Sequence, residues 1–167
     1  MATATRTTSL VDTPLTIDDR PEITFIELLF FAYRDFISDP DAVLAAYGFG
    51  RAHHRVIHFV NRHPGIRVAD LLDILKITKQ SLGRVLKQLI DGGFVEQMQG
   101  PTDRRQRLLY PTEAGRALCL RLMAPQERRI AAALKALSPH ERKVAEQFLR
   151  QVIDSDEREM VDRLIES

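Results

Sequence analysis

Residues 67–93 restrict the folds open to this chain more than any other segment. The runs RVADLLDIL (67–75) and TKQSLGRVLKQLIDGG (78–93) each place apolar residues at the helical period. Thr78 is the expected N-cap of the second helix, and the pair Gly92-Gly93 is its expected end. Two short amphipathic helices joined by a tight turn predict a helix-turn-helix unit.

The polar face of the helix expected at 78–91 carries side chains that can bind DNA. Arg and Lys bind guanine, Gln binds adenine, and Ser binds either. These side chains are Thr78, Lys79, Gln80, Ser81, Arg84, Lys87 and Gln88. Any amphipathic helix needs a polar face, but this one has no acidic residue before Asp91. The pattern therefore predicts a recognition helix.

A hairpin is expected directly after this helix. The strand-like runs FVEQMQ (94–99) and RLLY (107–110) flank GPTDRRQR (100–107), which is typical of a wing. Arginines at a hairpin tip suit the narrow, negatively charged minor groove of DNA. The expected contacts at this tip are Asp103, Arg104, Arg105 and Arg107. Asp103 is expected to pair with a neighbouring arginine and to hold its guanidinium in place, rather than to bind DNA.

The distribution of charge agrees with an anionic partner for the middle of the chain. The 167 residues carry 24 basic and 23 acidic side chains, so the net charge alone says little. Residues 1–50 hold three basic and eight acidic side chains, whereas residues 51–116 hold twelve basic and six acidic. Basic residues thus gather where the helix-turn-helix and the wing are expected.

Other features exclude whole classes of protein. The single cysteine, Cys119, excludes an intrachain disulfide and fits a reducing compartment. No apolar run approaches the roughly 20 residues needed to span a bilayer, so a cytoplasmic bacterial protein is expected. The sequence has no G-x-S-x-G, P-loop, dinucleotide fingerprint or H-E-x-x-H. We therefore expect no enzyme activity and no cofactor.

The ends of the chain are expected to form dimerisation helices around the DNA-binding part. Residues 1–20 lack periodicity and predict a flexible tail, whereas 21–50 hold a helix and a linker. The segment PEITFIELLFFAYRDFI is apolar on two stripes, and a second subunit is the expected cover. Residues 51–114 are the expected winged helix-turn-helix domain, and 115–167 the expected C-terminal dimerisation helices.

Helix boundaries are expected at several further capping signals. Asp39 before Pro40 predicts the N-cap of a short helix that ends near Tyr47. Thr112 and Glu113 begin a helix with an expected kink at Pro125. Ser138-Pro139-His140-Glu141 is a capping box. A single long helix with an apolar stripe from Val144 to Leu164 is expected to follow it.

Four histidines lie close together in the sequence, at His53, His54, His58 and His63. His54 and His58 are spaced i, i+4, which can place two imidazoles on one metal ion, but no local cysteine or acid completes a ligand set. Packing or hydrogen bonding at a domain seam is the main alternative, and no metal site is predicted. A third alternative is an effector pocket lined by Phe30, Tyr33, Arg34, His54 and His58. Cys119 lies among leucines and is expected to be buried and inert.

The chain resembles the MarR family of winged helix-turn-helix transcriptional regulators over roughly residues 22–160. LLDILKITKQSLGRVLKQLIDGGFVEQ, GPTDRRQRLLYPTEAGRAL and the helices after them carry the resemblance. The most specific part is the wing motif, D-x-R followed by an apolar strand and L-T-x-x-G. Here it is Asp103, Arg105 and Pro111-Thr112-Glu113-Ala114-Gly115, with Pro where the family usually has Leu.

This resemblance implies a mainly α fold with a minor β part, in which N- and C-terminal helices form a homodimer. It implies that the dimer binds a pseudo-palindromic operator in double-stranded DNA, with a small-molecule pocket between the dimerisation and DNA-binding parts. The family's wing-tip arginine falls on Arg105, its supporting aspartate on Asp103, and its recognition contacts on Lys79, Gln80, Ser81 and Arg84. Two alternatives are a metal-responsive regulator that uses His53, His54 and His58, and a winged-helix module that binds protein. The charged wing tip argues against the second, since protein interface cores are depleted in charge.

Overall fold

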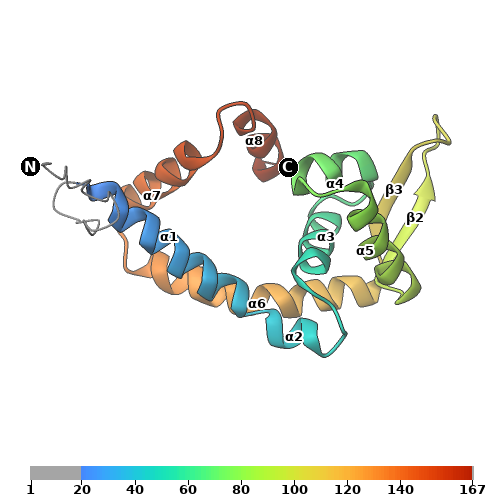
Figure 1. Cartoon of the computed structure of the whole chain (residues 1–167), viewed down its shortest axis with the longest axis horizontal. Helices are drawn as coiled ribbons and strands as arrows, with labels where there is room; N and C mark the ends of the chain where they lie inside the picture. Colours follow the sequence, from blue (N-terminus) through green and yellow to red (C-terminus); the bar gives the residue numbers. More distant parts are fainter. Residues whose placement is uncertain (1–19, 167) are drawn as a thin grey trace, which may run out of the picture. The chain divides into compact units, whose positions relative to one another are not determined.

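The computed structural model of the chain describes residues 20–166 (Figure 1). The helices are α1 (Pro21–Ser38), α2 (Asp41–Ala45), α3 (Arg51–Arg62), α4 (Val68–Leu75), α5 (Lys79–Asp91), α6 (Glu113–Lys135), α7 (Pro139–Val152) and α8 (Arg158–Glu166). The strands are β1 (Ile66–Arg67), β2 (Val95–Gln99) and β3 (Arg107–Pro111).

The predicted mainly α winged-helix fold is confirmed. The chain divides into two units between Asp35 and Phe36, and the tail predicted for 1–20 lies, except for Arg20, outside the described residues.

Local signals set the limits of the helix-turn-helix. Lys76 follows α4 in the left-handed region, with φ of 49°, which turns the chain toward α5. Thr78 caps α5 as predicted, because its Oγ1 accepts a hydrogen bond from the backbone N–H of Ser81 at 3.2 Å. The helix ends at Gly92, and Gly93 has φ of 74°, a conformation that glycine adopts without strain.

The wing is a hairpin within a small sheet. The three strands are antiparallel in the order β1-β3-β2, and the register pairs Glu96 with Tyr110 and Ile66 with Leu109. The hairpin β2–β3 was predicted. Strand β1 was not, because two residues are too few to show an alternating pattern.

One apolar core holds the winged helix together. Its fully buried side chains come from α2 to α6 and from β2 and β3, and they are Leu44, Val56, Ile57, Val60, Leu71, Leu82, Leu89, Val95, Leu109, Leu118 and Leu122. Each helix of the helix-turn-helix thus contributes one apolar face, as the periodicity predicted. The outer face of α5 is therefore left to solvent.

The N-cap predicted at Asp39 is wrong. The cap of α2 is Pro40, which makes no side-chain hydrogen bond as a cap. Asp39 instead binds the guanidinium of Arg129 on α6 through both carboxylate oxygens, at 2.7 and 2.8 Å. This pairing lowers the pKa of Asp39. Two parallel hydrogen bonds to a cationic guanidinium are stronger than the hydrogen bond of a carboxylate to a backbone N–H, so Asp39 binds Arg129 and does not cap α2.

The single long C-terminal helix that we predicted is also wrong. The capping box at Ser138 and Glu141 is confirmed, but α7 stops at Val152 and Ile153 is extended, with ψ of 139°. Asp154-Ser155-Asp156 follows, and such side chains compete with the helical backbone for hydrogen bonds. Arg158 then donates to the carbonyl oxygens of Ile153 and Gln151, both at 2.9 Å, so the end of α7 is satisfied without a further turn.

Helix α6 begins at its predicted N-cap, Thr112, and continues through Pro125 to Lys135. The kink expected at Pro125 stays a prediction.

An ion pair connects α4 with the segment before α8. Lys76 at the end of α4 pairs with Glu157, with Nζ 2.7 Å from Oε1. Within residues 20–166, no helix combines the length and the apolarity needed to cross a bilayer.

Gly115 allows α6 to pack closely against Phe94, which directly precedes β2. A Cβ added at Gly115 would collide with the carbonyl oxygen of Phe94, which accepts the backbone N–H of Thr112 at 3.2 Å. We expect Gly115→Ala to lower the free energy of unfolding by about 1–3 kcal/mol, the usual cost of overpacking. Urea denaturation at one fixed protein concentration measures this change.

Gly83→Ala is the matched control for this substitution. Gly83 also lies in a helix, but a Cβ there meets nothing within 4 Å. The change should raise the free energy of unfolding by about 0.5–1 kcal/mol, because alanine is the better helix former. Equal effects of the two substitutions would contradict the close contact at Gly115.

Candidate nucleic-acid interface

Helix α5 lies beside the β2–β3 hairpin (Figure 1). One face of this helix is a row of polar residues that are exposed to solvent. The exposed side chains of this row are Thr78, Lys79, Gln80, Ser81, Arg84, Lys87 and Gln88. The opposite face of the helix holds the buried Leu82, Val85, Leu86 and Leu89. The predicted polar residues therefore do share one exposed face.

Several members of the row already have partners within the chain. Thr78 Oγ1 donates to Ser81 Oγ at 2.9 Å, so both hydroxyls serve the helix cap. Lys87 Nζ lies 2.5 Å from Asp91 Oδ2 in an i, i+4 ion pair. In the described part of the chain, no hydrogen bond or ion pair engages the side chains of Lys79, Gln80 or Arg84. These three retain all their donors for a bound partner.

The wing tip is braced by hydrogen bonds to its own backbone. Asp103 Oδ1 accepts the backbone N–H of Arg105 at 2.9 Å, and Arg107 Nη1 donates to the carbonyl of Arg104 at 2.9 Å. The pairing that we predicted between Asp103 and a guanidinium is not made among residues 20–166. A short carboxylate reaches the N–H two residues further along more easily than the end of a long side chain. Arg104 and Arg105 are both exposed at this tip.

An arginine held by an aspartate does occur near the wing, at Arg67. Its Nε and Nη2 donate to the two oxygens of Asp70 at 2.8 and 2.5 Å, while Asp70 also accepts the Arg67 backbone N–H at 3.2 Å. This pairing lowers the pKa of Asp70 and raises that of Arg67. Arg67 belongs to β1, next to the wing strand β3. Sequence reasoning missed it, although R-x-x-D at a helix start carries the signal.

The histidines of α3 differ in their surroundings. His53 is buried, and its ring contacts Gln88 of α5, with Nε2 2.8 Å from Oε1. Burial lowers the pKa of His54, His58 and His63, which favours their neutral forms. Across residues 20–166, no three His, Cys, Asp or Glu side chains come together to hold a metal ion.

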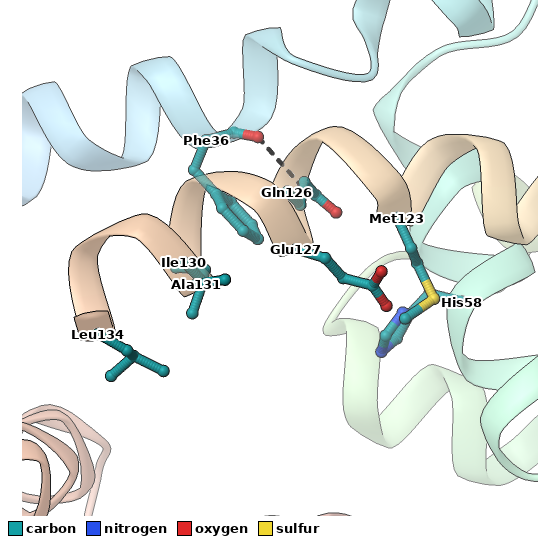
Figure 2. A pocket seen from close by; sticks show the side chains of 8 residues that line it. All are labelled: Phe36, His58, Met123, Gln126, Glu127, Ile130, Ala131 and Leu134. Carbon is teal, nitrogen blue, oxygen red and sulfur yellow. Dashed lines mark hydrogen bonds between the residues drawn. The ribbon is translucent and has the colours of Figure 1, made fainter. Parts of the chain in front are cut away.

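A cavity of about 360 Å³ lies beside α6 (Figure 2). Its lining residues are Phe36, His58, Met123, Gln126, Glu127, Ile130, Ala131 and Leu134. Gln126 Nε2 donates to the Phe36 carbonyl at 3.1 Å and so ties the end of α1 to α6. Of the five residues proposed for an effector pocket, His58 lines this cavity and His54 does not, while the role of Phe30, Tyr33 and Arg34 stays a prediction.

Cys119 is buried, as predicted, and lies close to this cavity through Met123. Its Sγ is 3.6 Å from Met123 Sδ. Burial raises the pKa of the Cys119 thiol to about 11, and the nearby Glu127 adds to this effect. The reactive thiolate is therefore scarce at neutral pH.

A model of a known protein family matches the part of the chain that forms the candidate interface. A family model described as the MarR family matches residues 47–106, which include α3, α4, α5, β2 and most of the wing tip. The HTH-type transcriptional regulator PetP of Rhodobacter capsulatus is 55% identical over 93 residues. This match covers 56% of this chain and 56% of PetP, so the chain spans about half the length of this curated relative.

Solved structures share the fold at lower identity. A mutant of MarR from E. coli complexed with operator DNA has a TM-score of 0.61 and 22% identity, covering 85% of this chain and 100% of that one. The PcaV regulator of Streptomyces coelicolor, in complex with its natural ligand, has a TM-score of 0.60 and 18% identity. That match covers 86% of this chain and 99% of PcaV. The curated relative PetP is a transcriptional regulator, in agreement with the expectation that the chain is not an enzyme.

Proposed function

We propose that this chain, which belongs to the MarR family over its winged-helix segment, is a transcriptional regulator that binds double-stranded DNA sequence-specifically as a homodimer. The observation that carries the proposal is the exposed row on α5, in which Lys79, Gln80 and Arg84 keep all their donors. A row of this kind on the second helix of a helix-turn-helix suits the major groove.

The wing supports a second contact with the same DNA. Arg104 and Arg105 extend from a tip whose backbone is braced, so either guanidinium can enter the minor groove with little loss of backbone freedom. Arg67 adds a candidate phosphate contact at the start of α4, because Asp70 fixes its guanidinium while Nη1 stays available. We propose that α5 reads bases and that Arg67 and the wing hold the duplex.

The terminal helices support a homodimer. No described residue of α1 is buried, and Phe25, Ile26, Leu28, Phe30, Phe31 and Tyr33 are 49% to 70% exposed in the single chain. On α7, Val144, Leu149 and Val152 are 51% to 55% exposed. Apolar surface of this extent marks a protein interface. A two-fold dimer would present two copies of α5 to an operator with inverted half-sites.

Dimerisation predicts a solution mass of twice 19.0 kDa by light scattering at micromolar concentration. Leu28→Glu combined with Leu149→Glu should shift this mass toward the monomer, because each change places a charge within an apolar interface. Leu120→Glu is the matched control, since Leu120 is 67% exposed on the N-terminal half of α6. It should leave the dimer intact. A wild-type chain that is monomeric under these conditions would contradict the architecture.

The cavity beside α6 supports control by a small molecule. Its volume falls within the range of ligand pockets, and its lining is mostly apolar, with Gln126, Glu127 and the neutral form of His58 as the polar groups. We propose that an effector bound there would be a largely apolar compound that makes a few hydrogen bonds.

Selection from a random pool of DNA duplexes tests the proposed function directly. The full chain should enrich an inverted repeat whose half-sites lie about one helical turn apart, or a multiple of one turn. The same experiment reports sequence preference, symmetry and target. A pool that shows no enrichment after repeated rounds would overturn the proposal.

A further inference from the structure

Among the described residues, His53 of α3 is the buried polar side chain, with 8% of its surface exposed. Its ring stacks on Phe49, with the ring centroids 4.6 Å apart and the planes 6° from parallel. Nδ1 lies 3.1 Å from the backbone nitrogen of Gly50, and Nε2 lies 2.8 Å from Gln88 Oε1. Each ring nitrogen of His53 thus forms a hydrogen bond, Nδ1 with the backbone at the start of α3 and Nε2 with a side chain of α5.

The two contacts define the tautomer of the ring. A backbone N–H can only donate, so Nδ1 of His53 must accept from Gly50 and carries no hydrogen in the neutral ring. Nε2 then carries the hydrogen and donates to the side-chain oxygen of Gln88. The hydrogen bond between α3 and α5 therefore has a fixed direction, set by the N-terminal end of α3.

This hydrogen bond can define the rotation of α5 about its own axis. The apolar contacts of α5, such as Leu82 and Leu86, favour burial but depend little on small rotations. A hydrogen bond depends on both distance and angle. Gln88 follows Arg84 by one helical turn and Gln80 by two, so these three side chains lie on one face. Holding Gln88 therefore also directs Arg84 and Gln80.

We propose that His53 is a positioning residue for DNA recognition, which orients the reading face of α5 through Gln88. This inference rests on the proposed function. It assigns Gln88 to the support of the recognition helix, although its position in the polar row led us to group it with the base-reading residues. His53 itself touches no DNA in this arrangement.

Two substitutions of His53 separate its two hydrogen bonds. Asparagine places an oxygen near the position of Nδ1, so His53→Asn keeps the acceptor for Gly50 and loses the contact with Gln88. Glutamine reaches the position of Nε2, so His53→Gln keeps a donor for Gln88 and loses the acceptor for Gly50. The readout is the ratio of the Kd for a scrambled duplex to the Kd for the selected operator, measured by fluorescence anisotropy alongside the Tm of each variant.

We expect His53→Asn to lower this ratio by about 10-fold, since one orienting hydrogen bond is lost in each of two half-sites. His53→Gln should retain the ratio, whatever its Tm. A purely structural role would instead make the ratio follow the Tm in both variants. If both variants kept the ratio of the wild type, or both lost it equally, the positioning role would be overturned.

Gln88→Met tests the same link from an exposed side chain, where folding is not at risk. It should lower the ratio as His53→Asn does, and the double variant should be no worse than either single one. A loss in Gln88→Met without a loss in His53→Asn would make Gln88 a direct reader of bases and overturn the inference. A wild-type chain without discrimination would refute the proposed function and this inference with it. Discrimination kept in both the wild type and His53→Asn would refute this inference alone.

Discussion

Arg105→Ala is expected to weaken binding to the selected operator by about 1–3 kcal/mol per half-site, the range of an oriented arginine contact. The exposed guanidinium is lost from the minor groove, where the negative potential is strongest. The slope of log K against log salt should also become shallower by about 0.9 for each lost cation. Fluorescence anisotropy at two salt concentrations measures both effects.

Asp103 tests whether the wing acts as a braced structure or only as a basic patch. Its carboxylate accepts the backbone N–H of Arg105, so Asp103→Ala should loosen the tip and weaken binding, although it removes a negative charge. Asp103→Asn keeps an oxygen that can accept the same N–H and also removes the charge. It should therefore bind DNA at least as tightly as the wild type.

The double variant completes this test. Without Arg105 the brace at Asp103 has no guanidinium to position, so Asp103→Ala with Arg105→Ala should bind little worse than Arg105→Ala alone. Fully additive losses would contradict the positioning of Arg105. Tighter binding by Asp103→Ala than by the wild type would show that only the charge of the wing matters.

Most of the fold could be predicted because its signals are local. The caps at Thr78, Thr112 and Ser138 each depend on a hydrogen bond to a residue three positions further along. The end of α5 depends on Gly92 and Gly93. The residues that form each cap or helix end are close together in the sequence, so the sequence pattern alone predicts where these helices begin and end.

The errors arose where a distant residue competes for a side chain. Asp39 had the right sequence position for a cap, but Arg129, 90 residues away, binds it instead. His53 and Gln88 are 35 residues apart, and nothing in the local sequence of either indicates the partner. The long helix after Ser138 failed for another reason, because Asp154-Ser155-Asp156 is a local break that outweighs the apolar stripe.

The candidate interface was predictable as a surface but not in its internal bonding. Periodicity alone places the polar row of α5 opposite the buried leucines. It does not show that Thr78 and Ser81 bind each other, or that Lys87 binds Asp91. Only the structure shows that Thr78, Ser81 and Lys87 already have partners, whereas the donors of Lys79, Gln80 and Arg84 are available. This difference predicts which substitutions on α5 change sequence preference.

Gln80→Ala and Arg84→Ala are expected to relax sequence preference as well as to weaken binding. Each should cost about 1–3 kcal/mol per half-site on the selected operator, the range of a base-reading contact, and much less on a scrambled duplex. The reason is that both side chains are exposed on α5 with no partner among residues 20–166. Anisotropy titrations on both duplexes, followed by a second selection with each variant, measure the change in preference at individual base positions.

Lys87→Ala is the matched control, because Lys87 lies on the same exposed row but already pairs with Asp91. Its loss should weaken binding to both duplexes by a similar, small factor, as expected for a charge that acts without reading bases. If Lys87→Ala relaxed the preference as much as Arg84→Ala, then free donors would not distinguish the reading residues. If neither Gln80→Ala nor Arg84→Ala changed the preferred sequence, α5 would not be the reader, and the bases would have to be recognised by another element such as the wing.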